Sequence, residues 1–373
     1  MLPEGTKIIS ADDHMIEHPD LWLDHLPAKY RDDGPRVIKV DGMDKWSFQD
    51  ELVGIESGST RLRQGDGESV RWVNFDEIRP GCYDPVARLA DMDEDGVWGQ
   101  LCFPNYARFA GHRFQKAKDP ELGLACIRAY NDYLLDTWCA TDRERLSGMA
   151  LIPIWDLDAA ITELHRAAGK GARAVGFSEN PTVLGLPSVH TDHWDPLWAA
   201  VSDVDIPICM HIGSSSRLIN TSDDAPGSIQ VALLGLNSIM AGVDWLLCGV
   251  LERFPKLRVI LSEGGAGWVP YIIERCDKIF WDYRVGRHQE PGARPPSELF
   301  AEHMYVCMVT EHFALRVIGD IPVDNLLWEG DYPHGDGLWP HNRKWLEDAM
   351  VDVDDADAVK IAETNPRRLL GIQ

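Results

Sequence analysis

The chain is short of positive charge. Among its 373 residues, 36 are Lys or Arg and 60 are Asp or Glu, which gives a formal net charge of −24. Such a surface repels phosphate backbones, so we expect no nucleic-acid partner. No block of like charge is long enough to indicate a disordered tail. The excess of acidic residues is therefore interpreted as a contribution to solubility.

Signals for export and for membrane insertion are absent as well. The first ten residues, MLPEGTKIIS, contain no basic region followed by an apolar stretch, so no signal peptide is expected. The longest apolar stretch, near 231–251, is interrupted by Asn237 and Asp244 and does not predict a membrane span. We therefore expect a cytoplasmic protein without a membrane partner.

The sequence has no closely paired cysteines. None of its eight Cys forms a C-x-x-C motif, and most lie inside apolar runs such as LCFP, ICMH and YVCM. A disulfide framework is typical of small secreted chains rather than of a chain of this length. We expect free, buried thiols at Cys82, Cys102, Cys126, Cys139, Cys209, Cys248, Cys276 and Cys307.

What the sequence does contain is a regular alternation of two patterns. Apolar residues make up 45% of the chain, enough for a large core. Short β-rich runs alternate with longer amphipathic helical stretches, which indicates βαβ units around a parallel sheet. The runs are 7–14, 97–104, 146–153, 172–179, 206–213, 257–264, 304–310 and 325–331. Eight strands predict a closed (β/α)₈ TIM-type barrel that occupies one domain, residues 1–373.

Helical patterns lie between these runs, at 85–96, 122–142, 156–170, 194–203, 233–254 and 269–283. Residues 286–297 (GRHQEPGARPPS) predict a loop, because Pro and Gly interrupt the pattern there.

A second interruption, at about 33–80, predicts an inserted lid. The segment contains RVIKV and KWSFQ, which indicate a small hairpin, and then a stretch rich in Gly and charge. Because it follows the first strand, we expect it to sit over the barrel mouth. Trp46 and Trp72 in this segment, with Trp268 after the sixth strand, would suit a flat or apolar substrate. Trp is also a common core residue, so simple packing is the alternative.

Candidate metal ligands stand at the ends of the predicted strands, where barrel enzymes carry their working residues. Asp12 and His14 end the first strand, and strand alternation puts both on one face with Asp13 on the other. His211 ends the fifth strand and Asp331 the eighth. A carboxylate and an imidazole two residues apart can bind one ion together.

Each ligand taken alone has an ordinary structural explanation. His211 could be a core histidine satisfied by hydrogen bonds, and Asp331 could cap a turn or a helix. Their shared position at one barrel mouth favours a metal site. A mixed set of imidazoles and carboxylates suits Zn²⁺ or Mn²⁺ and leaves a position open for water or substrate.

Further candidates surround this set. Glu263, at the end of the sixth strand, could be a general base, orient a substrate, support a ligand histidine or simply form a salt bridge. Glu17 could act near the site or cap a turn. His334 could line the mouth or be exposed by its turn. Arg217 could clamp a carboxylate or be an ordinary surface residue. Asn105, with its neighbour Tyr106, is a candidate for substrate contact.

Several of these motifs together resemble the amidohydrolase superfamily, and specifically the amidohydrolase-related branch that contains the aminocarboxymuconate-semialdehyde and resorcylate-type decarboxylases. The resemblance runs nearly end to end. The segments that carry it are ISADDHMIEHPDLW (9–22), DPVARLADMDEDGV (84–97), WDPLWAA (194–200), PICMHIG (207–213), FPKLRVILSEGGAGWVPYIIERCD (254–277), LLWEGDYPH (326–334) and ETNPRRLLGI (363–372).

The resemblance implies a distorted (β/α)₈ barrel that holds one divalent ion. It maps the acidic-x-His pair of the family onto Asp12 and His14, the strand-5 histidine onto His211 and the strand-8 aspartate onto Asp331. No Lys stands near the end of the fourth strand (ARAVGFSEN), so the carbamylated lysine of dinuclear relatives is missing and one ion is expected. We expect Zn²⁺ first and Mn²⁺ as the alternative, a small-molecule substrate, and a homo-oligomer.

One departure from the family bears on the reaction. The decarboxylases carry a His at the end of strand 6, where this chain has Glu263. A carboxylate there can accept a proton from a metal-bound water but would repel a carboxylated substrate. The sequence therefore favours a mononuclear hydrolase of a small, aromatic or carboxylated molecule, in which Asp331 or Glu263 deprotonates the water.

Two alternatives stay open. The first is a non-oxidative decarboxylase of an aromatic or dienoic acid. The second is a barrel that binds a ligand without turning it over, which the complete four-ligand set disfavours.

Overall fold

The computed structural model describes residues 2–56, 72–282 and 293–373. Eight parallel strands form one sheet, and their order in the sheet follows their order in the chain. The strands are β1 (Ile8–His14), β6 (Val97–Phe103), β7 (Leu146–Ala150), β8 (Ala174–Gly176), β9 (Ile208–His211), β10 (Val259–Ser262), β11 (Met304–Met308) and β12 (Leu326–Trp328). All eight lie within the predicted runs, so these predictions are confirmed.

The chain just beyond β12 brings the last strand of this sheet against the first. Asp331 N donates to Asp12 O at 3.0 Å, and His14 N donates to Tyr332 O at 2.6 Å. The sheet is thereby nearly closed into a barrel, as predicted. The same two hydrogen bonds hold the ends of β1 and β12, which carry three of the predicted ligands, side by side.

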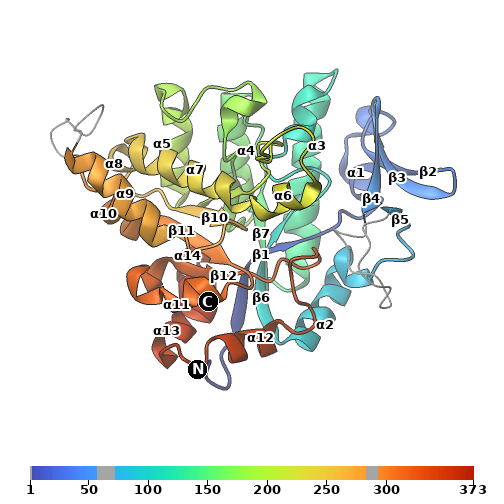
Figure 1. Cartoon of the computed structure of the whole chain (residues 1–373). Coiled ribbons are helices and arrows are strands. Elements are labelled where there is room, and N and C mark those ends of the chain that lie inside the picture. Colours follow the sequence, from blue (N-terminus) through green and yellow to red (C-terminus); the bar gives the residue numbers. More distant parts are fainter. Residues whose placement is uncertain (1, 57–71, 283–292) are drawn as a thin grey trace.

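Helices cover the outside of the barrel (Figure 1). Those in the six predicted ranges are α2 (Pro85–Asp95), α3 (Pro120–Tyr133), α4 (Leu157–Gly169), α5 (Asp195–Val204), α7 (Gly235–Leu247) with α8 (Val250–Arg253), and α9 (Val269–Asp282). The predicted helix 233–254 is divided because Gly249 adopts φ 75°, a left-handed conformation that favours glycine. The others are α1 (Leu21–His25), α6 (Gly227–Ala232), α10 (Pro296–His303), α11 (His312–Arg316), α12 (Asn342–Ala349), α13 (Asp355–Val359) and α14 (Asn365–Leu370).

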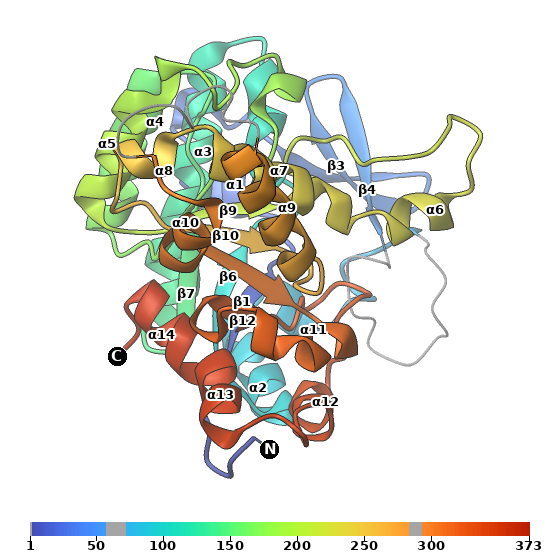
Figure 2. The ribbon, with the colours of Figure 1, turned by 60° about the vertical axis from the view of Figure 1, so that its left-hand side comes forward.

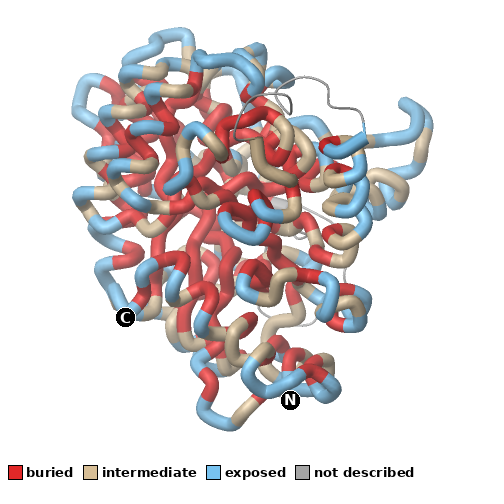
Figure 3. The backbone as a smooth tube through the Cα atoms, turned by 90° about the vertical axis from the view of Figure 1, so that its left-hand side faces the viewer, coloured by how far each residue is buried: buried red, intermediate tan, exposed pale blue. Residues whose placement is uncertain are grey.

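The core lies along the strands and the inner faces of these helices (Figure 3). Every residue of β1 is buried, as is every residue of β7, β9 and β10. This explains why the strands appear in the sequence as continuous apolar runs rather than as alternating ones. All eight cysteines are buried and free, as predicted.

The predicted insertion after β1 forms a small antiparallel sheet. Its strands are β2 (Arg36–Val40), β3 (Met43–Phe48), β4 (Glu51–Glu56) and β5 (Trp72–Val73), and β2 and β3 make the predicted hairpin. Trp46 is buried, with its ring stacked on Tyr106 at 4.6 Å, so it packs in the core. The Trp72 side chain and most of the predicted loop 286–297 lie outside the described residues. Closure of this sheet over the barrel mouth stays a prediction.

One helical stretch, Gly227–Leu247, is long and apolar enough by length and composition to cross a membrane. It comprises α6 and α7, and 33% of its apolar window is buried. One such stretch is weak evidence for a membrane span, because mostly buried core helices pass the same test. Figure 2 shows α6 extending away from the barrel. The expected absence of a membrane partner stays a prediction.

Candidate metal centre

The four predicted ligands converge at the mouth of the barrel. Asp12 and His14 end β1, and His14 Nε2 lies 3.1 Å from Asp12 Oδ1. His211, at the end of β9, places its Nε2 3.2 Å from His14 Nε2 and 3.4 Å from Asp12 Oδ2. Asp331, just beyond β12, brings Oδ1 to 3.4 Å from His14 Nε2. All four side chains are buried.

The two histidines are held so that their Nε2 lone pairs face each other. His14 Nδ1 lies 3.1 Å from Pro104 O, and His211 Nδ1 lies 2.6 Å from Ile212 O. A carbonyl only accepts, so each Nδ1 carries the proton and each Nε2 is bare. Burial is the largest cause that lowers the pKa of both imidazoles, which keeps them neutral. Two bare nitrogens 3.2 Å apart repel each other unless a cation lies between them.

The carboxylates need a cation too. Both oxygens of Asp12 are buried and receive no hydrogen bond. Burial and the nearby carboxylates, Glu263 among them, raise the pKa of Asp12 and of Asp331 well above its ordinary range. A buried, unpaired carboxylate is costly, and a divalent ion is the partner that satisfies several at once. The observed separations also fit, because bonds of about 2.0–2.2 Å place two ligands of one ion roughly 3.0–3.5 Å apart.

Glu263 enters the same cluster from the end of β10. Its Oε2 lies 3.5 Å from His211 Nε2 and its Oε1 3.9 Å from His334 Nδ1. Burial opposes its ionisation, but His211 and His334 outweigh burial and lower the pKa of Glu263 to about 2. The residue is therefore a carboxylate at any working pH.

Glu329 supports the backbone of Glu263, and it was not identified from the sequence. It is fully buried, and Glu263 N donates to its Oε1 at 3.0 Å. This contact holds Glu263 at φ 55°, a left-handed backbone that aims the side chain into the mouth. Glu329 stands two residues before Asp331, after the apolar run LLW. An acidic residue directly after an apolar strand was the signal available in the sequence, because acidic residues are seldom buried without a partner.

His334 lies over the ligands from the turn that follows Asp331. Its Nδ1 is 2.9 Å from Asp331 Oδ1, and its ring stacks on His14 at 4.0 Å between centroids. Asn105 Nδ2 lies 3.1 Å from His334 Nε2, so two of the predicted substrate-contact residues are in contact with each other. Burial opposes protonation of His334, yet Asp331 and Glu263 outweigh it and raise its pKa to about 10.

The sequence left Glu17 open between action near the site and a capping role, and its contacts are those of a cap. Any contact of Glu17 with substrate stays a prediction. Glu17 is buried, and its carboxylate accepts hydrogen bonds from the backbone N–H groups of Asn105, Tyr106 and Ala107 at 2.7–3.1 Å. The structure therefore makes Glu17 the anchor of the loop after β6 rather than a group open to the mouth.

That loop also carries Phe109, a second residue that the sequence analysis missed. The Phe109 ring stacks on His211 at 3.8 Å between centroids and lies 5.2 Å from the His14 ring. A lone Phe in a loop carries no periodic signal, so only the fold reveals this contact. The ring gives the site a flat apolar wall.

Arg217 is exposed on the loop that follows β9, where Asn237 Nδ2 donates to its backbone carbonyl at 2.8 Å. Within the described residues, no side-chain contact joins Arg217 to the ligand cluster. Its predicted role as a clamp for a substrate carboxylate stays a prediction.

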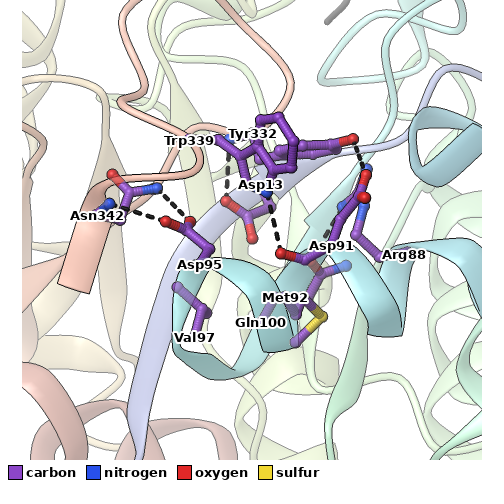
Figure 4. Close-up of a pocket in the computed structure, with 11 residues that line it drawn as sticks. Asp13, Arg88, Asp91, Met92, Asp95, Val97, Gln100, Tyr332, Trp339 and Asn342 are labelled. Carbon is purple, nitrogen blue, oxygen red and sulfur yellow. Dashed lines mark hydrogen bonds between the residues drawn. The ribbon is translucent and has the colours of Figure 1, made fainter. Parts of the chain in front are cut away.

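Behind β1, on the face opposite the ligands, a buried polar network fixes both ends of the site (Figure 4). Asp13 Oδ1 accepts from Tyr332 N at 3.0 Å, and Arg88 donates to the carbonyl oxygen of His14 at 2.5 Å. Tyr332 OH donates to Asp91 at 2.5 Å. The cavity between these groups is about 10 Å³, no more than one water molecule needs. The polar network therefore supports the ligands, and the cavity within it is too small to be a substrate pocket.

The comparisons with known proteins agree with this architecture. The amidohydrolase family model matches residues 25–372, so the chain belongs to the amidohydrolase family, as the motifs indicated. The chain is 25% identical over 307 residues to the gamma-resorcylate decarboxylase of Rhizobium radiobacter, a match that covers 76% of this chain and 85% of the relative.

Solved structures share the fold. An amidohydrolase from Mycobacterium avium subsp. paratuberculosis superposes with a TM-score of 0.79 at 21% identity and covers 99% of this chain and 100% of its own. A dihydroxybenzoic acid decarboxylase from Polaromonas, which holds bound manganese, gives a TM-score of 0.62 at 19% identity, with 98% and 97% covered. In this chain, metal binding is supported by the ligand cluster described above.

Proposed function

We propose that this enzyme is a metal-dependent, non-oxidative decarboxylase of a small aromatic carboxylic acid. The observation that carries the proposal is the convergence of imidazole and carboxylate ligands at the barrel mouth, in a chain whose curated relative is named a decarboxylase. The flat wall of Phe109 beside His211 suits an aromatic ring.

Hydrolysis, which the sequence favoured, is the second candidate. The observation in its favour is Glu263, whose carboxylate lies 3.5 Å from His211 Nε2 where the related decarboxylases carry a His. A carboxylate there can take a proton from water. The relatives support decarboxylation more strongly, so hydrolysis is placed second.

The ion expected in the site is Mn²⁺, with Zn²⁺ as the alternative. Apart from His334, which contacts Asp331, the converging side chains offer two imidazole nitrogens and three carboxylates, from His14, His211, Asp12, Asp331 and Glu263. Oxygen-rich sets suit Mn²⁺, whereas Zn²⁺ takes nitrogen and sulfur readily. When bound, the ion would act as a Lewis acid that draws electron density from the substrate.

Decarboxylation breaks the bond between the ring and the carboxyl carbon, releases CO₂ and forms a carbon–hydrogen bond. The site must therefore deliver one proton to the ring carbon in each turnover. His334 is placed to hold that proton on Nδ1, between Asp331 and Glu263. Asn105 lies against Nε2 of the same ring, where its amide oxygen can accept from Nε2–H once the amide is turned. Phe109 would pack against the substrate and exclude water.

The test compares two reactions on the same Mn²⁺-loaded protein. CO₂ release is measured with 2,6-dihydroxybenzoate, 5-carboxyvanillate and a panel of hydroxybenzoates, and hydrolysis with 4-nitrophenyl esters and anilides. We expect CO₂ release from at least one acid, abolished in Asp12→Asn and after metal removal. Hydrolysis of esters or anilides with no CO₂ from any acid would reverse the order of the two candidates.

A further inference from the structure

Glu263 is placed to bind the ion itself. Its carboxylate belongs with His14, Asp331 and His334 to a group whose possible ligand atoms all lie within 4.8 Å of one another. A second group of the same kind joins Asp12, His14 and His211. The two groups share His14, so one ion in contact with Asp12, His14 and His211 lies beside Glu263 as well.

The distances agree with a shared ion. Glu263 Oε2 is 3.5 Å from His211 Nε2, close to the 3.4 Å between Asp331 Oδ1 and His14 Nε2. These are separations of neighbouring ligands, since bonds of about 2.1 Å give edges of roughly 3.0–3.5 Å. A direct hydrogen bond from His211 Nε2 to Glu263 is excluded by the tautomer, because the His211 proton is on Nδ1, against the Ile212 carbonyl.

The backbone is built to present this side chain. Glu263 occupies φ 55°, which costs energy for a residue with a Cβ. Two contacts from Glu263 N to the Glu329 carboxylate, at 3.0 and 3.3 Å, hold it there. Strain of this kind persists where the surroundings over-determine it, and the result is a carboxylate aimed at the ion.

We propose that Glu263 is a fifth protein ligand, so that Asp12, His14, His211, Glu263 and Asp331 bind one ion together. In six-coordinate Mn²⁺ this set leaves a single position for water, whereas the four-ligand set leaves two. The residue is thus part of the metal site and not a free general base.

The experiment counts the water molecules on bound Mn²⁺ by electron–nuclear double resonance in ¹⁷O-labelled water. We expect one water on the wild-type protein and two on Glu263→Gln, with a dissociation constant for Mn²⁺ at least tenfold higher in the variant. Co²⁺ gives a second readout, because its visible absorption changes when the ligand set changes. None of these measurements uses turnover, so they are independent of the proposed reaction.

The matched control is Glu311→Gln. Glu311 is a partly buried carboxylate that supports the same loop, by accepting from Ala266 N at 2.8 Å, and it is no ligand. Its variant should keep one water and the wild-type affinity. Two waters on the wild-type protein would overturn the proposal, and this result needs no folded variant. The proposal would also be overturned if Glu263→Gln bound Mn²⁺ more weakly but kept the wild-type water count and Co²⁺ spectrum. A residue that only positions the ligands would behave that way.

Discussion

At the scale of single residues, His334 is the group whose charge decides the proposed chemistry. Its pKa is raised to about 10 by Asp331 and Glu263 against the effect of burial. A histidine with a raised pKa keeps its proton below that pKa and loses it as the pH rises through it. We therefore expect His334 in the metal-free protein to keep its proton from pH 7 to 9 and to lose it near pH 10. The measurement is a pH titration of the ¹⁵N-labelled imidazole by NMR in metal-free protein.

Replacement of the same residue provides the control. His334→Gln keeps a hydrogen-bonding side chain beside Asp331 but cannot donate an acidic proton. We expect kcat of the Mn²⁺-loaded variant to fall roughly 10²–10⁴-fold, the usual contribution of a positioned general acid, and the resonance that titrates near pH 10 to be missing from the metal-free variant. A His334 resonance that titrates between pH 6 and 7 in the metal-free wild-type protein, as an unperturbed histidine would, contradicts this assignment.

Glu17 is the residue whose removal should cost the most stability near the site. Its carboxylate accepts from three consecutive backbone N–H groups of the loop after β6. Glu17→Ala leaves these buried donors without a partner, at about 1–3 kcal/mol for each group that finds no water. We expect the free energy of unfolding to fall by about 3 kcal/mol in urea titrations monitored by circular dichroism.

Glu17→Gln is the milder comparison, because one side-chain oxygen remains to accept. It should lose about half as much stability as Glu17→Ala. If Glu17→Ala has the same urea midpoint of unfolding as the wild-type protein, other contacts hold the loop and Glu17 is not its anchor.

At the scale of elements, α2 links a helix cap to the metal centre. The helix begins after Asp84, whose Oδ1 accepts from Val86 N at 2.8 Å and Ala87 N at 3.0 Å. It carries Arg88, which reaches the carbonyl oxygen of His14. We expect Asp84→Ala to cost about 1 kcal/mol of unfolding free energy, the usual value of an N-cap, and Arg88→Met to weaken Mn²⁺ binding about tenfold.

The two variants check each other in urea titrations and in Mn²⁺ titrations followed by electron paramagnetic resonance. The hydrogen bonds of the Asp84 side chain are to the first turn of α2 and not to the metal ligands. Asp84→Ala should therefore lower the free energy of unfolding and leave the Mn²⁺ affinity within about twofold. A loss of affinity in Asp84→Ala as large as that in Arg88→Met would mean that α2 acts through general stability and not through Arg88.

The elements also separate what the sequence could predict from what it could not. Strand positions follow from apolar runs, and the ends of parallel strands meet at one mouth, so Asp12, His14, His211 and Asp331 could be grouped from the sequence alone. Phe109 and Arg88 could not. Phe109 is brought to His211 by a loop whose shape depends on Glu17, and Arg88 contacts a residue 74 positions away. Neither contact has a period or a spacing that a sequence displays.

The insertion and the residues beside the ligands show the same limit. The hairpin of β2 and β3 was predicted from the runs RVIKV and KWSFQ, but the burial of Trp46 against Tyr106 depends on where that sheet docks. Glu263 was recognised at its strand end, yet whether it binds the ion or takes a proton depends on distances to His211 and on its backbone at φ 55°. Such geometry is set by tertiary packing.

At the scale of the whole molecule, the remaining question is how copies of the chain associate. The resemblance implies a homo-oligomer, and large apolar side chains are exposed at several places in spite of the net charge of −24. One such place is on α6 and α7, where Val231 is 59% and Met240 48% exposed, and Figure 2 shows α6 reaching away from the barrel. Exposed apolar surface of this kind is typical of subunit contacts.

We therefore expect the purified protein to have at least twice the chain mass of 41.9 kDa in size-exclusion chromatography with light scattering. The double substitution Val231→Asp and Met240→Asp should shift it to the mass of one chain, because charge at a buried contact is costly. Val86→Asp is the matched control, since Val86 is 67% exposed on α2 and should leave the mass unchanged. A wild-type protein of one chain mass would contradict the oligomer. An oligomer that survives the double substitution would place the contact on a different surface, because a buried pair of aspartates on each subunit could not be tolerated at this one.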